Sequence, residues 1–308
     1  MENYNIQTTT TELKSILPSI KNDKKQTIFK IANKSICDDE IVSIIGAQLK
    51  KLPETIINNP IEIVLKDSAM LYNQEAGYTT WNLNFADPNL VEYYDSYLFA
   101  QDEIQVAEHP YLASCRKLIL QNGYEATTID DDGFGSPILF TNIPRMCKVK
   151  ITDEIYGKNF EKATDEMIEK HIYPLHHTTL SNIVAICSLS GFEGYYTSIQ
   201  IGWLMANLYG AFTKIKEIAT KKIIIETGYW GCGAFGGNKV LMIALQYLVA
   251  KMVGIDKIIF HTISSIQQPA LDGIDMIDSL LKIENLNTID VIYALEYMKF
   301  VWGKSDMN

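Results

Sequence analysis

Several features are absent from this 308-residue sequence, and each absence excludes a class of protein. Its five cysteines are scattered and form no C-x-x-C pair, so we expect neither a zinc site nor a disulfide framework. No apolar run approaches the ~18 residues that a membrane-spanning helix needs, and the polar N-terminus is unlike a secretory signal. We therefore expect a cytoplasmic protein, with delivery into a host cell cytosol left open.

Positive charge is also scarce. The chain has 27 lysines and arginines against 37 aspartates and glutamates, a net charge of −10, and no basic cluster. Binding to nucleic acid or to an acidic membrane depends on such clusters, so we expect neither partner. His171, His176 and His177 lie near one another but lack a carboxylate or cysteine at ligand spacing, so we expect no metal site and no cofactor.

The chain divides into two parts by pattern. Residues 1–58 are predicted to be a helical accessory region, because "TTTTELK" offers a threonine cap and "DDEIVSIIGAQLKKLPETI" repeats its apolar residues near helical spacing. From residue 59 to 308, short β-prone runs alternate with helical segments, which is typical of an α/β domain with a mixed sheet. The β-prone runs are 61–66, 81–86, 136–141, 182–187, 221–227 and 256–262, and the helical segments are 101–121, 197–219, 238–253 and 287–301.

One stretch, "TGYWGCGAFGGN" at residues 227–238, holds five glycines between an apolar run and a helical pattern. Glycine leaves backbone N–H groups unshielded, and the helix that follows presents its positive end, so the combination is typical of a pyrophosphate site. A tight structural turn would also explain the glycines. The aromatic residues Tyr229, Trp230 and Phe235, however, suit stacking on a base or a ribose.

The same loop satisfies G-x-G-x-x-G through Gly231, Gly233 and Gly236, and Asp256 lies twenty positions further on. In a dinucleotide-binding unit that acid ends the second strand, whereas Asp256 precedes the run "KIIF". A nicotinamide oxidoreductase is therefore a minor alternative. There is no G-x-x-x-x-G-K-[ST] motif, so a P-loop NTPase is not predicted.

The loop closely resembles the "TGNWGCGAFGGD" loop of the poly(ADP-ribose) glycohydrolase family, whose catalytic domain is a macrodomain. Upstream, "NFADPNLVEYYDSYLFAQDE" resembles the family's second signature, in which a F-A-N segment, a triple glycine and Q-E-E follow one another. Residues 85–87 match F-A-N and residues 101–103 match Q-E-E without a gap. The resemblance covers roughly residues 61–300 and implies a macrodomain-like three-layer fold that binds ADP-ribose.

The resemblance also implies a role for individual residues. Glu103 matches the family's catalytic acid, and Asp102 matches the companion that holds the distal ribose. The glycine loop would cradle the diphosphate, with Phe235 against a ribose. Glu75 is the nearest candidate for the carboxylate that binds adenine. The implied ADP-ribose-binding residues are Glu75, Ala86, Asp87, Gln101, Thr227, Gly228, Tyr229, Gly231, Cys232, Gly233, Ala234, Phe235, Gly236 and Gly237.

Hydrolysis of a glycosidic bond requires acids of this kind for reasons independent of any family. The transition state resembles an oxocarbenium ion, which a carboxylate stabilises, while the leaving group needs a proton donor and the attacking water needs a base. A carboxyl group clustered with other carboxylates near a pyrophosphate has a raised pKa, as a general acid requires. Asp102 and Glu103 fit this demand, and the sequence leaves open which of them donates the proton.

The chain departs from the family pattern in one place. Val91, Glu92 and Tyr93 stand where the family has three glycines, and Asp87 stands where it has asparagine. With Asp95 nearby, this segment is strongly acidic. Paired carboxylates match the planar donors of a guanidinium group, so an acidic distal end favours an arginine linkage. A location of Glu92 and Asp95 on a solvated loop is the competing interpretation.

We therefore predict a hydrolase that releases mono-ADP-ribose from arginine on a protein substrate. Asp87 and Asp95 would orient the guanidinium and the distal ribose, and Glu103 or Asp102 would act as acid and base. The alternatives are a domain that binds ADP-ribose without cleaving it and a glycohydrolase that acts on poly(ADP-ribose). The oligomeric state is not predicted.

Overall fold

The computed structural model describes residues 4–263 and 267–306. Within these ranges, eight strands form one mixed sheet in the order β1-β2-β5-β6-β4-β7-β8-β3. The strands are β1 (Asn5–Thr9), β2 (Ile41–Gly46), β3 (Glu62–Lys66), β4 (Tyr78–Ala86), β5 (Ile138–Val149), β6 (Ile172–Cys187), β7 (Lys222–Gly228) and β8 (Lys257–His261).

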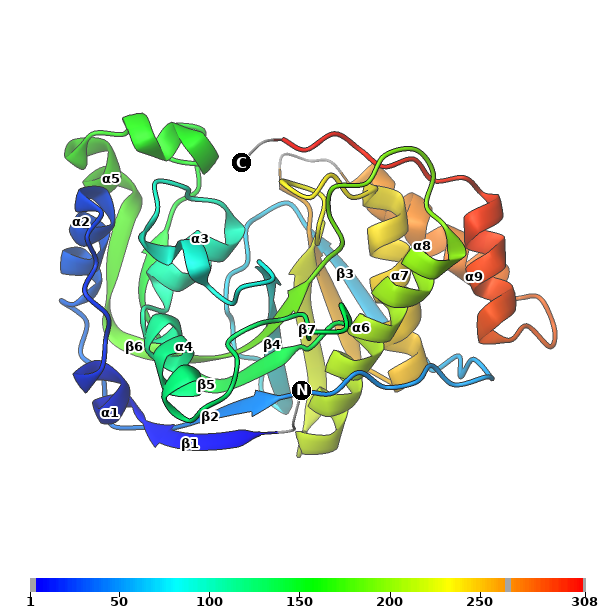
Figure 1. Cartoon of the computed structure of the whole chain (residues 1–308), viewed down its shortest axis with the longest axis horizontal. Coiled ribbons are helices and arrows are strands. Elements are labelled where there is room, and N and C mark those ends of the chain that lie inside the picture. The colour runs from blue at the N-terminus through cyan, green and yellow to red at the C-terminus, as the bar shows by residue number, and fades with distance from the viewer. Residues whose placement is uncertain (1–3, 264–266, 307–308) are drawn as a thin grey trace.

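Helices cover both faces of the sheet, with α1 to α5 on one side and α6 to α9 on the other (Figure 1). This arrangement is the predicted three-layer α/β fold, which is confirmed. The α-helices are α1 (Thr10–Ser15), α2 (Asp23–Ala32), α3 (Gln101–Glu108), α4 (Tyr111–Gln121), α5 (Asp165–His171), α6 (Ser198–Ile218), α7 (Lys239–Val253), α8 (Gln268–Leu280) and α9 (Thr288–Tyr297); two short 3-10 helices are η1 (Glu92–Asp95) and η2 (Gly157–Lys162).

The central strands are apolar on both faces because both faces are covered. On β6, Ile183 and Ala185 pack into the core beneath α3 and α4. Their neighbours Val184 and Ile186 point the other way and pack into the core beneath α6 and α7. The continuous apolar run "NIVAIC" is therefore a strand buried from two sides, and each face has its own hydrophobic core.

The two halves of the sheet differ in strand direction. Pairing is antiparallel from β1 through β2 and β5 to β6, and parallel from β6 through β4, β7 and β8 to β3. The edge strand β3 takes all its ladder partners from β8. In a parallel sheet the carboxyl ends of the strands lie along one edge, where ligand sites form. The acidic segment after β4 and the glycine loop after β7 therefore meet at this edge.

Local rules explain how several elements begin and end. Thr9 accepts a hydrogen bond from the backbone of Glu12 and so caps α1, as the sequence predicts. The helical segment predicted at 101–121 is divided into α3 and α4 at Pro110, which has no N–H group to continue the first helix. The helix α8 has no counterpart among the predicted elements.

The helix predicted from "DDEIVSIIGAQLKK" is wrong, because Ile41–Gly46 forms strand β2. The isoleucines in this stretch satisfy helical and strand spacing equally, and the antiparallel ladder with β5 decides between them, with Ile44 opposite Phe140. The N-terminal part therefore contributes two strands to the common sheet as well as two helices. A domain boundary at residue 58 stays a prediction.

None of the helices in the described parts of the chain is both long and apolar enough to cross a membrane. All five cysteines are free thiols, and Cys115, Cys147 and Cys187 are buried.

The assignment of β2 can be tested by truncating two of its isoleucines. Ile44 is 0% exposed and Ile41 is 63% exposed. We expect Ile44→Ala to lower the free energy of unfolding by about 2–4 kcal/mol, because it leaves a cavity in the core. Ile41→Ala should change it by less than about 0.5 kcal/mol. Urea unfolding measures both, and equal effects of the two substitutions would contradict the strand.

Candidate active site

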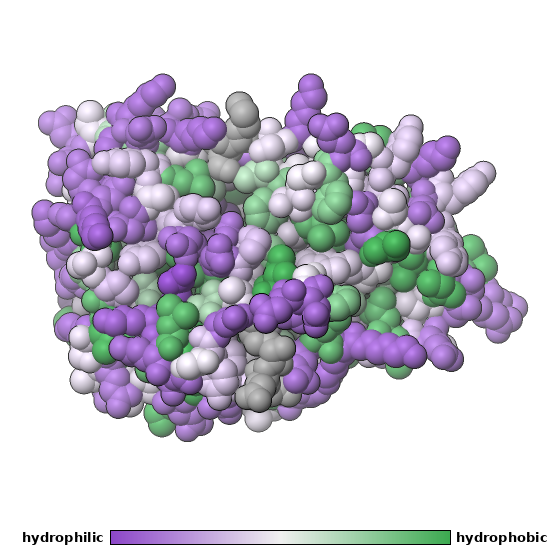
Figure 2. All heavy atoms as spheres, in the orientation of Figure 1, coloured by the Kyte–Doolittle hydropathy of each residue, from purple (hydrophilic) through white to green (hydrophobic). Residues whose placement is uncertain are grey.

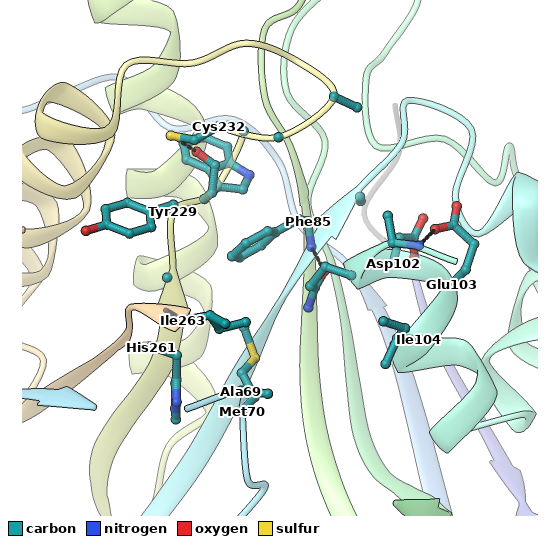
Figure 3. A pocket seen from close by; sticks show the side chains of 18 of the residues that line it. Ala69, Met70, Phe85, Asp102, Glu103, Ile104, Tyr229, Cys232, His261 and Ile263 are labelled. Atoms are coloured by element: carbon teal, nitrogen blue, oxygen red, sulfur yellow. Dashed lines mark hydrogen bonds between the residues drawn. The ribbon is translucent and has the colours of Figure 1, made fainter. Parts of the chain in front are cut away.

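A cavity of about 450 Å³ opens between α3 and the loop that follows β7. Figure 2 shows that hydrophilic side chains dominate the outer part of this face of the molecule, while paler and green residues gather toward its middle. In the close view, Phe85 stands between Tyr229 and Cys232 on one side and the acids of α3 on the other (Figure 3). Segments far apart in the sequence thus form the two walls of one cavity.

Most of the residues expected to bind ADP-ribose lie on these walls. Those that line the cavity are Ala86, Asp87, Gln101, Asp102, Glu103, Thr227, Gly228, Tyr229, Gly231, Cys232, Gly233, Ala234 and Phe235. Four expected residues, Glu75, Asp95, Gly236 and Gly237, do not line it.

The two acids lie in the first turn of α3. Glu103 occupies the third helical position, and its Oε2 accepts a hydrogen bond of 2.9 Å from the backbone N–H of Ala100. Oδ1 of Asp102 accepts one of 2.9 Å from Nδ2 of Asn84 on β4. Both side chains are almost fully buried, with 8% of Asp102 and 4% of Glu103 exposed.

Gln101 attaches this turn of α3 to the sheet. Its Oε1 accepts a hydrogen bond from the backbone N–H of Phe85 at 2.9 Å, and its Nε2 donates to the carbonyl oxygen of Leu83 at 3.3 Å. The side chain therefore binds the exposed backbone of β4 as a neighbouring strand would. The position of the acids relative to β4 is fixed as a result.

Burial raises the pKa values of both acids. The pKa of Asp102 rises to about 7, mainly because the carboxyl is desolvated and also because Glu103 carries a like charge, while the hydrogen bond from Asn84 opposes the rise. The pKa of Glu103 is also raised by burial, and the nearby ammonium of Lys25 opposes this rise most strongly. Two coupled acids of this kind hold one proton between them near neutral pH.

The opposite wall is a turn that requires glycine. Gly231 has φ +70°, and a Cβ placed there would lie 2.4 Å from Oγ of Ser188. The N–H of Gly237 donates to the carbonyl of Gly231 at 2.8 Å and closes the turn. Gly236 receives a hydrogen bond of 2.7 Å from Gly303 in the C-terminal segment. Gly236 and Gly237 thus shape the loop without lining the cavity.

The loop leaves backbone donors available to a ligand. Within the described chain, the N–H groups of Gly231, Gly233, Ala234 and Phe235 donate no backbone hydrogen bond. The loop leads directly to Asn238, which caps the 15-residue helix α7. Unpaired amides at the positive end of a long helix form an anion site.

The α3 wall carries acids, whereas the loop wall carries one cation, Lys239, together with Asp306, whose N–H donates to the carbonyl of Gly233. On the loop side, Lys239 lines the cavity with its Nζ 5.1 Å from the centre of the Tyr229 ring. On the α3 side, Asp87 joins Asp102 and Glu103. Burial raises the pKa of Asp87, while a hydrogen bond from the backbone N–H of Asn89 opposes the rise. The cavity can therefore hold an anionic group at one end and a cationic or protonated group at the other.

Asp95 does not face the cavity, so the expectation that it orients a substrate is wrong. Its carboxylate accepts hydrogen bonds of 2.9–3.0 Å from the backbone N–H groups of Lys21 and Asn22, just before α2. Glu92 likewise turns outward and pairs with Arg116. Glu92 is exposed, as the solvated-loop interpretation expects, whereas Asp95 is half-buried in η1 and binds the backbone before α2.

Glu75, the candidate for the carboxylate that binds adenine, also lies away from the cavity. Both of its carboxylate oxygens contact Nζ of Lys257, at 2.9 and 3.0 Å. Lys257 begins β8, whereas His261, which lines the cavity, ends that strand. Glu75 therefore lies at the far end of the strands from the cavity.

The segment that replaces three glycines keeps a backbone conformation suited to glycine. Val91 has φ 47° and ψ 31°, in the left-handed region that β-branched residues rarely adopt. Its side chain is buried in the core beneath α3, while Tyr93 lines the cavity. Packing of Val91 thus holds this turn without the freedom of glycine, and the ring of Tyr93 forms part of the cavity wall.

Several residues of the site were not predicted. Asn84 had a usable signal, because "WNLNF" alternates apolar residues with asparagines, and both Asn82 and Asn84 are buried on the face beneath α3. Met70, His261 and Asp306 line the cavity without any motif to mark them. Their positions depend on the folding of loops and of the C-terminal segment.

A model of the catalytic domain of poly(ADP-ribose) glycohydrolase (PARG), with the macrodomain fold, matches residues 138–269. Residues 138–269 are thus similar to the PARG catalytic domain, and the fold of the chain is that of a macrodomain. The matched residues include the glycine loop of this macrodomain, and the segment with Asp102 and Glu103 precedes them. No curated protein sequence matches the chain.

The macrodomain is similar to solved structures of bacterial PARG. With PARG from Thermomonospora curvata it shares 13% identity over 87% of this chain and 88% of that chain, at a TM-score of 0.44. With the Thermomonospora curvata PARG bound to the inhibitor ADP-HPD, the identity is 10% over 87% and 88%, at a TM-score of 0.47. With PARG from Deinococcus radiodurans in complex with ADP-ribose, it is 10% over 91% and 95%, at 0.43.

The raised pKa of Asp102 predicts how stability varies with pH. In the fold the carboxyl keeps its proton up to about pH 7, whereas in the unfolded chain it loses the proton near pH 3.9. The free energy of unfolding should therefore fall as the pH rises from about 4 to 7. In Asp102→Asn, which can still accept the hydrogen bond from Asn84, the fall should be smaller. At pH 8 this variant should exceed the wild type by about 1–4 kcal/mol.

Urea unfolding at several pH values measures this difference. Asp131→Asn, at an exposed position, is the matched control and should follow the wild type. An Asp102→Asn variant that is no more stable than the wild type at pH 8 would show that the carboxyl is not held protonated by burial.

Proposed function

We propose that this macrodomain hydrolyses the glycosidic bond of ADP-ribose attached to a protein, with preference for the linkage to arginine. One observation carries the proposal: a single cavity brings a turn with unpaired amides at a helix N-terminus within reach of two buried, adjacent acids. The first feature suits a diphosphate and the second suits glycosidic chemistry.

The charge of the two walls gives the ligand a direction. The diphosphate would accept hydrogen bonds from the loop between Gly231 and Phe235, with Lys239 adding positive charge. The distal ribose would then lie toward α3, with its anomeric carbon near Asp102 and Glu103. Phe85 and Tyr229 offer ring faces between these ends (Figure 3).

The acid pair can supply each of the required proton transfers. Near neutral pH the pair holds one proton, so one acid protonates the leaving group while the ionised acid stabilises the positive charge that develops on the ribose. After departure of the leaving group, the deprotonated acid takes a proton from the attacking water. Bond cleavage thus ends with ADP-ribose, the free side chain of the substrate and the original protonation state.

Asp87 supports the arginine linkage. It lines the cavity beside the acid pair and comes from the loop after β4. A guanidinium leaving group would be held by carboxylates on two sides, whereas a neutral ester gains little from this charge. Asp95, which faces α2, has no part in this proposal.

Release of ADP-ribose from proteins modified through a single known linkage tests the proposal. We expect faster release from arginine-linked than from glutamate-linked substrate, and little shortening of poly(ADP-ribose) chains. Asp102→Asn and Glu103→Gln should each lower the rate by about 10²-fold or more, because each removes a group that handles a proton or charge. Glu92→Gln, outside the cavity, should leave it unchanged.

Substitution of Asp87 tests the linkage separately. Asp87→Asn should lower the rate with arginine-linked substrate more than the rate with glutamate-linked substrate. Faster release from glutamate by the wild type would overturn the arginine preference. Binding of ADP-ribose without release from any linkage would instead show a domain that recognises ADP-ribose and does not cleave it.

A further inference from the structure

Lys25 on α2 is an unusual residue in this fold, because its charged side chain is buried behind the acid pair. Only 4% of it is exposed, and no described residue accepts a hydrogen bond from its Nζ. A buried ammonium without a hydrogen-bond partner is costly, and lysine is seldom buried in this way. Some other interaction must therefore retain the charge at this position.

Two aromatic rings and the acids of the active site supply that interaction. Nζ lies 4.6 Å from the ring centre of Phe99 and 5.2 Å from that of Phe160, and the two rings stack at 4.4 Å. Phe99 directly precedes Ala100, whose N–H binds the carboxylate of Glu103. Desolvation lowers the pKa of Lys25 to about 8, and attraction to Glu103, and then to Asp102 and Asp95, opposes the change.

The position of Lys25 is fixed from both sides. Before it, Asp95 binds the N–H groups of Lys21 and Asn22, and Asn22 caps α2 by accepting from the N–H of Lys25 at 3.0 Å. Beside it, Nζ of Lys24 donates to the carbonyl of Ala163 at 2.6 Å. The start of α2 is thus joined to η1 and to the segment after η2, and its lysine cannot move away from α3 without breaking these contacts.

The charges around Glu103 are unequal. Asp102 and Asp87 face it as acids, Tyr156 lies near it, and Lys25 is the cation whose charge opposes the effect of burial on it. Asp102 interacts less strongly with Lys25 than Glu103 does, and its carboxylate accepts a hydrogen bond from the neutral amide of Asn84. Positive charge therefore acts more strongly on Glu103 than on Asp102.

We propose that Lys25 is a positioning residue for the hydrolysis: it keeps Glu103 ionised and so leaves the shared proton on Asp102, which makes Asp102 the proton donor. This inference rests on the proposed function. It gives helix α2, which belongs to the N-terminal part of the chain, a role in the active site. Lys25 does not line the cavity, so it acts through the acids and not on the substrate.

The direct test follows the carboxyl groups of Asp102 and Glu103 by carbon-13 NMR during a pH titration without substrate. In the wild type, Glu103 should titrate below Asp102. In Lys25→Met, which replaces the ammonium with an apolar group of similar length, the titration of Glu103 should move upward by about one pH unit and more than that of Asp102. Lys25→Arg should restore the wild-type order, and Lys30→Met, at an exposed site on the same helix, should change nothing.

Activity gives a second readout. The acidic limb of the pH profile of kcat should move upward in Lys25→Met while KM changes little, whereas a purely structural role would lower the rate equally at every pH. Unchanged titration of Glu103 in Lys25→Met would overturn the inference. If that variant does not fold, Glu103→Gln replaces it: nitrogen-15 NMR should then show Lys25 losing its proton at lower pH than in the wild type, and no change would overturn the inference.

The two proposals fail in different ways. Absence of hydrolysis with every linkage would reject the proposed function, yet the NMR titrations would still decide whether Lys25 sets the charge of Glu103. Hydrolysis with unshifted titrations would reject the role of Lys25 alone.

Discussion

The burial of two adjacent carboxyl groups at the start of α3 is the constraint on which the rest of the site depends. A lone buried carboxylate is costly, and two side by side repel each other as well. The fold meets this cost with a shared proton, with the amide of Asn84, with the backbone N–H of Ala100 and with the ammonium of Lys25. These stabilising groups come from β4, from the start of α3 and from α2. The buried acid pair is therefore stable only when all three elements are in place.

The parallel half of the sheet places this acid pair opposite an anion site. The carboxyl ends of β4 and β7 lie side by side, so the loops that follow them face each other across one cavity. Gln101 fixes α3 to β4, and Gly231 allows the loop after β7 to turn close to Ser188. This strand order therefore places free backbone donors at one end of the cavity and buried acids at the other.

Local pattern predicted most of the fold and the parts of the site that local chemistry determines. The glycine loop and the acids of α3 were identifiable because each lies in a contiguous stretch of sequence that resembles a signature of the PARG family. The orientation of the Asp95 side chain is not predictable in this way, because its hydrogen-bond partner, the backbone of Lys21, lies 74 positions earlier in the chain. For the same reason the spacing of residues 41–46 wrongly predicts a helix and no motif marks Lys25: the partners that define both are remote in sequence.

The pairing of β3 with β8 has a consequence for synthesis. β3 is an edge strand whose ladder partners all come from a strand near the other end of the chain. As the ribosome releases the chain from its N-terminus, β3 emerges early and cannot join the sheet until β8 has followed. Contacts so distant in sequence also slow folding. The newly made chain must therefore keep strand β3 unpaired until β8 has been synthesised.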